Sequence, residues 1–216
     1  MSSWVPLEAN PELFHAWSAK LGLDTQECEF YDVYGLDEEL LSMVPQPVHA
    51  VLLLFPLSPK IEERHRSEDE TYAESLLASE ILWFKQTIGN ACGTIGLLHA
   101  IANSPANTCI LPDTPLAHLL DQARKTTPEH RTMLLQDSTA LKSAHAAIAG
   151  EGQTVAPEAQ DPVNLHFVAF VRGSKGQLWE LDGRRKGPVE RPMHVPHATD
   201  LLRVVAQFVQ TYYVCY

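Results

Sequence analysis

The chain has 216 residues, 45% of them hydrophobic, and a formal net charge of −11 at pH 7. This length suits one domain with a full core, or two at most. The negative charge argues against nucleic acid as a main partner, because phosphate binding needs clustered Lys and Arg. The apolar runs are too short to cross a membrane and the N-terminus has no signal-peptide pattern, so we expect a protein of the cytoplasm or nucleus without a membrane partner.

The four cysteines, Cys28, Cys92, Cys109 and Cys215, form neither a CxxC pair nor a disulfide framework. A core of this size needs no disulfide, so we expect all four to be reduced. His194 and His197 are three positions apart, but Pro196 lies between them and no cysteine or acidic partner follows at ligand spacing, so we predict no metal site.

The N-terminal half alternates helices and strands. A helix is predicted from residue 11 to about 20, ended by Gly22. Alternating side chains predict a strand over 29–34, and a short helix follows over 37–43. The apolar run 48–55 has strand length, and we expect it to be a central strand covered on both faces.

The middle of the chain is mainly helical. Residues 59–80 are highly charged and indicate a solvated helix or a mobile connection with an ordinary wet surface. Three helical patterns, 115–124, 128–135 and 138–148, are separated by prolines and predict a helical lobe.

The stretch 85–100 places Cys92 between a turn and an apolar helix. The helix is apolar over most of its surface, so we expect it to be central and buried. A helix N-terminus favours the thiolate, the reactive form of cysteine. A free cysteine in this setting is more often a small core residue, and that reading stays open on these residues alone.

Gln86 lies shortly before Cys92 and carries an amide group. If the turn between them folds back, this NH2 and the Cys92 N–H can converge on the oxygen of an attacked carbonyl. One such donor in an oxyanion hole typically lowers the barrier by about 3–4 kcal/mol.

Beyond the helices, residues 149–162 are polar and rich in Gly, Ala and Pro, which predicts a long exposed loop. Two strands follow, 164–171 and 177–181, joined by a turn into an antiparallel hairpin. A turn centred on Ser174 places Asp182 directly opposite His166, while a two-residue turn shifts this register by one. Asp182 followed by Gly also fits an ordinary turn.

Four motifs occur in the order Gln, Cys, His, Asp. Gln86 and Cys92 lie in the segment from Gln86 to Ala100, the His in Asn164-Leu-His-Phe167 and the Asp in Leu181-Asp-Gly-Arg184; the loop sequences Glu151-Gly-Gln-Thr154 and Ala156-Pro157 lie between the Cys and His motifs. Together they resemble the ubiquitin C-terminal hydrolases, papain-like cysteine peptidases that release ubiquitin from small C-terminal adducts.

The resemblance implies a papain-like α+β fold, with a mainly antiparallel central sheet flanked by helices and an active-site crossover loop at about 149–162. We expect one catalytic domain over residues 1–216, monomeric and without a cofactor. Cys92 would attack, His166 transfer the proton, Asp182 hold the imidazole, and Gln86 stabilise the oxyanion.

The resemblance also implies ubiquitin as the partner, or a related ubiquitin-like protein, bound through its arginine-bearing tail and its body. The candidate contacts are Pro6, Leu7, Glu8, Glu12, Asp32, Glu151, Gly152, Gln153 and Thr154. For Glu8 and Glu12, an electrostatic role at the start of the first helix is an equally good explanation.

One departure from the family concerns the C-terminus. Family chains usually continue to a further apolar strand after a helix at about 199–210, whereas this chain stops at residue 216. The β-forming residues 211–216 are candidates to replace that strand; otherwise a sheet edge is exposed. The alternatives to a deubiquitinase are therefore a ubiquitin-binding module without turnover and an acyl-transfer enzyme acting on another amide.

Overall fold

The computed structural model describes residues 3–72, 76–153 and 164–214. In chain order the main elements are α1 (Pro11–Leu21), α2 (Glu38–Leu41), β1 (Ala50–Pro56), α3 (Pro59–Glu70), α4 (Cys92–Ala102), α5 (Pro115–Arg124), α6 (Pro128–Asp137), α7 (Thr139–Ile148), β2 (Leu165–Arg172), β3 (Gln177–Leu181), β4 (Val189–His194) and α8 (Leu201–Val209). Short 3-10 turns link some of them, and Gln210–Val214 extends α8 as a π-helix.

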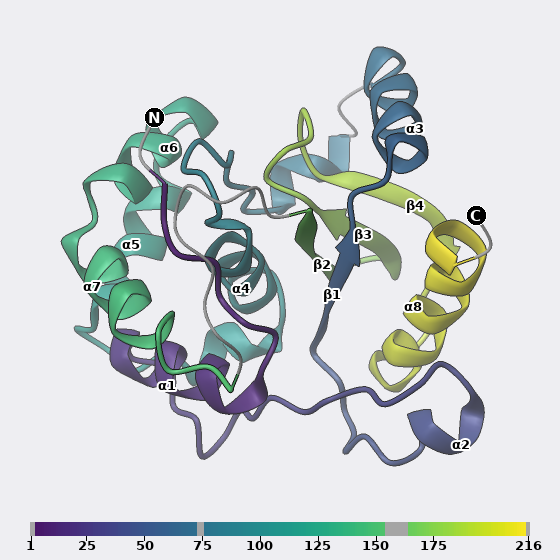
Figure 1. Ribbon diagram of the computed structural model, residues 1–216, viewed down its shortest axis with the longest axis horizontal. Helices are drawn as coiled ribbons and strands as arrows, with labels where there is room; N and C mark the ends of the chain where they lie inside the picture. Colours follow the sequence, from purple (N-terminus) through teal and green to yellow (C-terminus); the bar gives the residue numbers. More distant parts are fainter. Residues whose placement is uncertain (1–2, 73–75, 154–163, 215–216) are drawn as a thin grey trace.

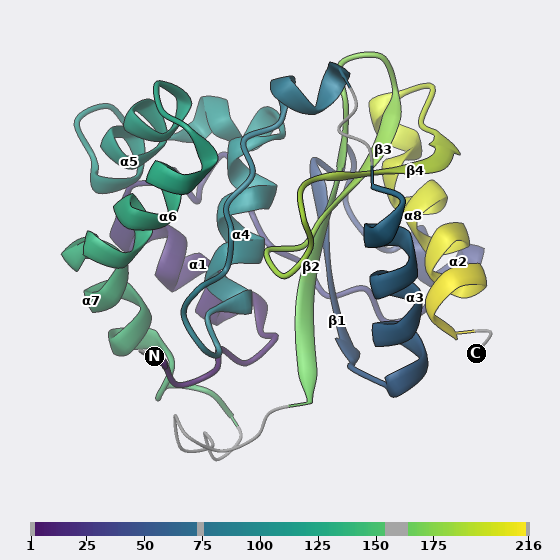
Figure 2. The same ribbon diagram turned by 90° about the horizontal axis from the view of Figure 1, so that it is seen from above.

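The strands form an antiparallel sheet in the order β1-β2-β3-β4. Helices α1, α4, α5, α6 and α7 make a lobe on one side of this sheet, and α3 and α8 lie on the other side (Figures 1 and 2). The expected α+β arrangement, an antiparallel sheet between helices, is present. Within the described ranges, no helix has the length and apolarity to cross a membrane.

Three helices of the lobe, α1, α5 and α6, begin where the sequence places a capping side chain before a proline. Asn10, Thr114 and Thr127 each accept a hydrogen bond from a backbone N–H of the first turn, and a proline follows each of them. Such caps satisfy N–H groups that have no partner within the helix. Gly22 ends α1 in the left-handed conformation, with φ 107°. The predicted boundaries of these helices are therefore close to those observed.

Helix α4 is the centre of the fold, and all of its residues are buried. It packs on β2 and β1, and its two interior glycines allow this close approach. A Cβ added to Gly93 would lie 3.1 Å from Leu7 Cβ, and one added to Gly96 would lie 3.2 Å from Leu52 Cδ2. The predicted buried central helix is confirmed.

Three predictions about strands need correction. The apolar run 48–55 forms β1, but β1 is an edge strand of the described sheet, with half-buried residues at 50–54. Residues 29–34 are not a strand; no neighbouring segment pairs with them in the described structure. The C-terminal segment is also not a strand, because residues 210–214 continue α8 as a helix and 215–216 lie outside the described residues.

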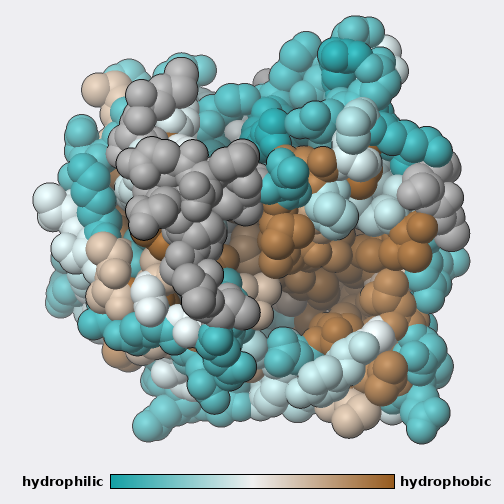
Figure 3. Space-filling view, viewed as in Figure 1, coloured by the Kyte–Doolittle hydropathy of each residue, from teal (hydrophilic) through white to brown (hydrophobic). Residues whose placement is uncertain are grey.

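An apolar hollow of about 750 Å³ opens beside β1, between the helical lobe and α8. Its walls include Phe14, Leu52, Leu54 and Val205. The hydrophobic surface is visible in the space-filling view, in the part of the face occupied by β1 and α8 (Figure 3). The unpaired edge of β1 therefore faces an apolar space rather than a further strand.

Candidate active site

Cys92 is the first residue of α4 and is 9% exposed. The turn before it contains Asn90 with a positive φ of 58°, a left-handed conformation that Asn adopts more readily than most residues. Ala91, the N-cap residue, supplies no side-chain cap, so the first N–H groups of α4 receive no hydrogen bond from it. The sulfur is thus held at the positive end of the central helix.

His166 and Asp182 lie together at the end of the hairpin. His166 Nε2 is 2.7 Å from Asp182 Oδ1, and both side chains are buried. The register differs from the one expected, because Ala169 pairs with Leu181 and the turn is displaced by one residue along the chain. Continuing this register, Asp182 lies diagonal to His166 on the same face, a spacing that the imidazole ring can bridge.

The charges in this site reinforce one another. Burial lowers the pKa of His166, but hydrogen bonds to Asp182 and Cys92 outweigh burial and raise that pKa to about 9. Burial raises the pKa of Asp182, whereas its hydrogen bond to His166 brings the pKa below its usual value. At neutral pH an imidazolium therefore lies between a carboxylate and the Cys92 side chain.

The loop that carries Asp182 is fixed on the side of the segment preceding α4. Arg184 N donates to Asp182 Oδ1 at 2.7 Å, and Trp83 Nε1 donates to the Asp182 carbonyl at 3.0 Å. Gln86 N donates to the Gly183 carbonyl at 2.9 Å. A Cβ at Gly183 would lie 2.8 Å from Gln86 Cβ, so the glycine permits this contact.

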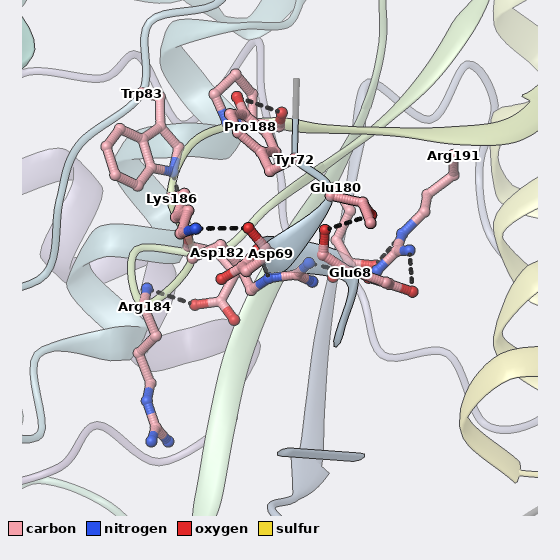
Figure 4. A network of polar contacts seen from close by, with 12 residues as sticks. Glu68, Asp69, Tyr72, Trp83, Glu180, Asp182, Arg184, Lys186, Pro188 and Arg191 are labelled. Atoms are coloured by element: carbon pink, nitrogen blue, oxygen red, sulfur yellow. Dashed lines mark hydrogen bonds and ion pairs between the residues drawn. The ribbon is translucent and has the colours of Figure 1, made fainter. Parts of the chain in front are cut away.

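The other side of the same loop is fixed by α3, in a network of ion pairs (Figure 4). Arg185 is buried and bonds Asp69 at 2.8 Å and Glu68 at 2.9 Å. Glu68 also pairs with Arg191, which forms two bonds to the fully buried Glu180. The expected ordinary wet surface over 59–80 is therefore wrong for Glu68 and Asp69.

These positioning residues were missed because their charges resemble those of any solvated helix. Acidic pairs on a short charged helix carry no sign of their partners, which lie more than 100 positions away in the sequence. The arginines that follow the Asp182 turn are the only related feature that the sequence shows, and their need for carboxylate or carbonyl partners becomes evident only once they are known to be buried.

Gln86 lies close to the site through its backbone. Its side-chain Nε2 donates to the Ile88 carbonyl at 3.2 Å, within the turn that leads to Cys92. The bond from Gln86 N to the Gly183 carbonyl joins this segment to the loop that carries Asp182. A carboxamide NH2 has two hydrogens, and the bond to Ile88 uses one of them.

The N-terminal segment runs beside this turn. Trp4 N donates to the Gly89 carbonyl at 2.9 Å, and Leu7 is buried against Gly93 in the first turn of α4. Glu8 Oε1 accepts from Gln153 N at 3.2 Å. The structure therefore places Leu7 beside the first turn of α4 and Glu8 beside the start of the predicted crossover loop, with Pro6 directly before them in the same segment.

The remaining predicted contact residues are more scattered. Glu12 and Asp32 are exposed, with Glu12 in the first turn of α1 and Asp32 in the segment that follows it. Glu151 and Gln153 are exposed and Gly152 is half-buried beside Glu8. Thr154 and the rest of the predicted loop, through 162, lie outside the described residues.

This arrangement can support nucleophilic catalysis. The cysteine at a helix N-terminus contacts an imidazole, and a carboxylate holds that imidazole through Nε2. Such a set activates a nucleophile and transfers its proton without a metal or an organic cofactor.

The family model of ubiquitin carboxyl-terminal hydrolase, family 1, matches residues 4–213. Ubiquitin carboxyl-terminal hydrolase 3 of Arabidopsis thaliana is 37% identical over 209 residues, which cover 96% of this chain and 88% of that relative. Isozyme L1 of Equus caballus is 40% identical over 197 residues, covering 91% and 85% of the two chains.

Solved structures give the same result for the fold. The catalytic domain of Trichinella spiralis UCH37, crystallised with ubiquitin vinyl methyl ester, aligns with a TM-score of 0.72 at 22% identity and covers 100% of this chain and 90% of that one. This likeness confirms the papain-like fold predicted from the sequence. With the family model spanning nearly all of its length, the chain belongs to family 1 of the ubiquitin carboxyl-terminal hydrolases.

Proposed function

We propose that this chain hydrolyses the bond that follows the C-terminal glycine of ubiquitin, with Cys92 as nucleophile. Thiol-dependent deubiquitinating activity is the activity of its family. The observation that carries the proposal is the set Cys92–His166–Asp182, in which His166 contacts both of the other side chains.

In the proposed reaction, the Cys92 thiolate attacks the carbonyl carbon of the last glycine. The oxyanion receives hydrogen bonds from the Cys92 N–H and the Gln86 amide. His166 then gives its proton to the leaving amine, and a thioester remains on Cys92. His166 next removes a proton from water, which attacks the thioester and releases ubiquitin and the free thiol.

Acidic residues near the site supply the proposed contacts to the arginine-bearing tail of ubiquitin. Glu8 and Glu151 lie close together, because Gln153 N bonds Glu8, and Glu8 belongs to the segment that passes Gly89 and Gly93. A basic tail laid along this segment would reach Cys92. Glu12 and Asp32 are proposed to contact more distant parts of ubiquitin.

The first test uses ubiquitin that carries a C-terminal electrophile. The wild-type chain should form a covalent adduct through Cys92, and Cys92→Ala should form none while still binding ubiquitin. Hydrolysis of a fluorogenic ubiquitin amide should fall by roughly 10⁴-fold or more in this variant. Binding without an adduct in the wild type would instead indicate a ubiquitin-binding module without turnover.

We further propose that the substrates are small or unfolded adducts. The predicted loop over 149–162 begins beside Glu8 and precedes the strand that carries His166, so a leaving group must pass close to its anchors. Lengthening the loop with Gly and Ser after Gln153 should therefore admit larger conjugates, such as two joined ubiquitins.

The control for this experiment is a small fluorogenic adduct, which is small enough to pass both the natural loop and the lengthened loop. Its turnover should change little, within about twofold, since insertion into a surface loop is tolerated. If the lengthened variant stays active on the small adduct and gains nothing on joined ubiquitins, the proposed size limit is wrong.

A further inference from the structure

Two cysteines outside the active site lie in contact. Cys28 Sγ and Cys109 Sγ are 2.7 Å apart as free thiols. Cys28 is buried and Cys109 is half-buried. They are 81 positions apart in sequence, so the fold brings them together.

Backbone hydrogen bonds fix the segments that carry these cysteines. Asp24 N donates to the Cys109 carbonyl at 2.8 Å, and Leu111 N donates to the Gly22 carbonyl at 2.8 Å. Cys28 N donates to the Asp24 carbonyl at 3.1 Å, so a single turn joins Cys28 to this short antiparallel bridge. The two sulfurs therefore stay close in the folded chain.

We propose that Cys28 and Cys109 form an intramolecular disulfide when the protein meets a disulfide oxidant such as oxidised glutathione. A disulfide bond is about 2.05 Å long, so the sulfurs need to approach by less than about 1 Å. The pair is a site of reversible covalent modification, separate from Cys92.

The reaction proceeds by two thiol–disulfide exchanges. The Cys109 thiolate attacks oxidised glutathione, forms a mixed disulfide and releases one glutathione thiolate. The Cys28 thiol then loses its proton and attacks Cys109 Sγ, forming the protein disulfide and releasing the second glutathione. In total, two protein thiols are oxidised to one disulfide while one oxidised glutathione is reduced to two thiols.

The environment sets the order of these steps. Burial, followed by the hydrogen bond to Cys109, raises the pKa of Cys28 to about 12, so its thiolate is scarce at neutral pH. Cys109 is more exposed and is the one that oxidant can reach. Cys28 acts second, when Cys109 already carries a good leaving group beside it.

The cross-link joins the turn after α1 to the segment after α4. The chain enclosed between the two cysteines contains both α4 and Cys92. Closing so long a loop restricts the unfolded chain, so the oxidised protein should have a higher Tm than the reduced one.

The test uses a Cys92→Ala, Cys215→Ser background, in which Cys28 and Cys109 are the only thiols. The folded protein is equilibrated with reduced and oxidised glutathione at graded ratios, then quenched with acid, unfolded and alkylated. Intact mass should change from two alkyl groups to none as the buffer becomes oxidising, without a glutathione adduct. The Tm should rise over the same ratios and return after reduction.

Adding Cys109→Ser to this background provides the matched control. It should retain one alkylatable thiol or carry one glutathione, and its Tm should not respond to oxidant as the parent does. Two alkylated thiols at every ratio, persistent mixed disulfides, or cross-linked dimers on a non-reducing gel would overturn the proposal.

Discussion

The surroundings of His166 shift its pKa in opposite directions, and the Asp182 carboxylate makes the upward shift larger. Burial favours the neutral imidazole, while the Asp182 carboxylate and Cys92 favour the imidazolium. The bond to Asp182 also fixes which ring nitrogen faces the sulfur. Replacing this carboxylate with an amide keeps the shape of the side chain and removes its charge.

For Asp182→Asn we therefore expect the pKa of His166 to fall from about 9 towards its usual value of 6.5. Turnover should fall by roughly 10²–10⁴-fold, because the imidazole loses its orientation and its charge partner. NMR titration of the His166 ring, together with steady-state kinetics, checks both effects. Asp113→Asn, on an exposed turn, is the matched control. An unchanged pKa in Asp182→Asn would contradict the assigned partnership.

At the scale of elements, the position of the C-terminal helical segment is fixed by contacts with α3. Tyr212 follows α8 and donates its hydroxyl to Glu68 Oε1 at 2.6 Å. Two guanidinium groups contact its ring, with Arg64 at 4.3 Å and Arg191 at 4.5 Å from the ring centroid. These contacts explain why the β-forming segment after α8 stays helical.

Tyr212→Phe should remove the hydroxyl bond and keep the contacts of the ring with both arginines. A hydrogen bond to a charged group contributes about 1.5–3 kcal/mol, so the free energy of unfolding should fall by this amount. Urea unfolding measures it, with Tyr34→Phe as the control because Tyr34 is 71% exposed. Equal stability of the two variants would mean that the bond to Glu68 contributes nothing.

Elements with local signals were predictable from the sequence. The three helices over 115–148 each begin after a capping side chain, α5 and α6 also begin with a proline, and Cys92, His166 and Asp182 lie in recognisable motifs. The edge position of β1 was not predictable, because an apolar run indicates burial but does not indicate which strands pair with it. The register of the hairpin and the partners of Glu68 also depend on tertiary packing.

At the scale of the whole molecule, the site makes stability depend on pH. His166 has a folded-state pKa of about 9, above the 6.5 of an unperturbed histidine. Its contribution to stability is therefore complete below about pH 6.5 and is lost as the pH rises through 9. Glu68 behaves oppositely, because its pKa is lowered to about 2 from 4.5. Burial alone would raise it, but the bonds to Arg191 and Tyr212 outweigh burial.

The Glu68 contribution is complete above about pH 4.5 and is lost as the pH falls towards 2. These two groups therefore predict highest stability between about pH 4.5 and 6.5, with a decline on both sides. Urea unfolding across this range measures the curve, and Asp182→Asn should flatten its alkaline side. If the variant declines as steeply as the wild type above pH 7, His166 is not the group responsible.

The complete burial of α4 also affects how its sequence can vary. Each residue from Cys92 to Ala102 has neighbours on every side, and Gly93 and Gly96 lack room for a methyl group without displacement of Leu7 or Leu52. In a close-packed interior almost any change of volume is destabilising. Selection for a stable fold would therefore preserve most of this segment even in a descendant that had lost its catalytic cysteine.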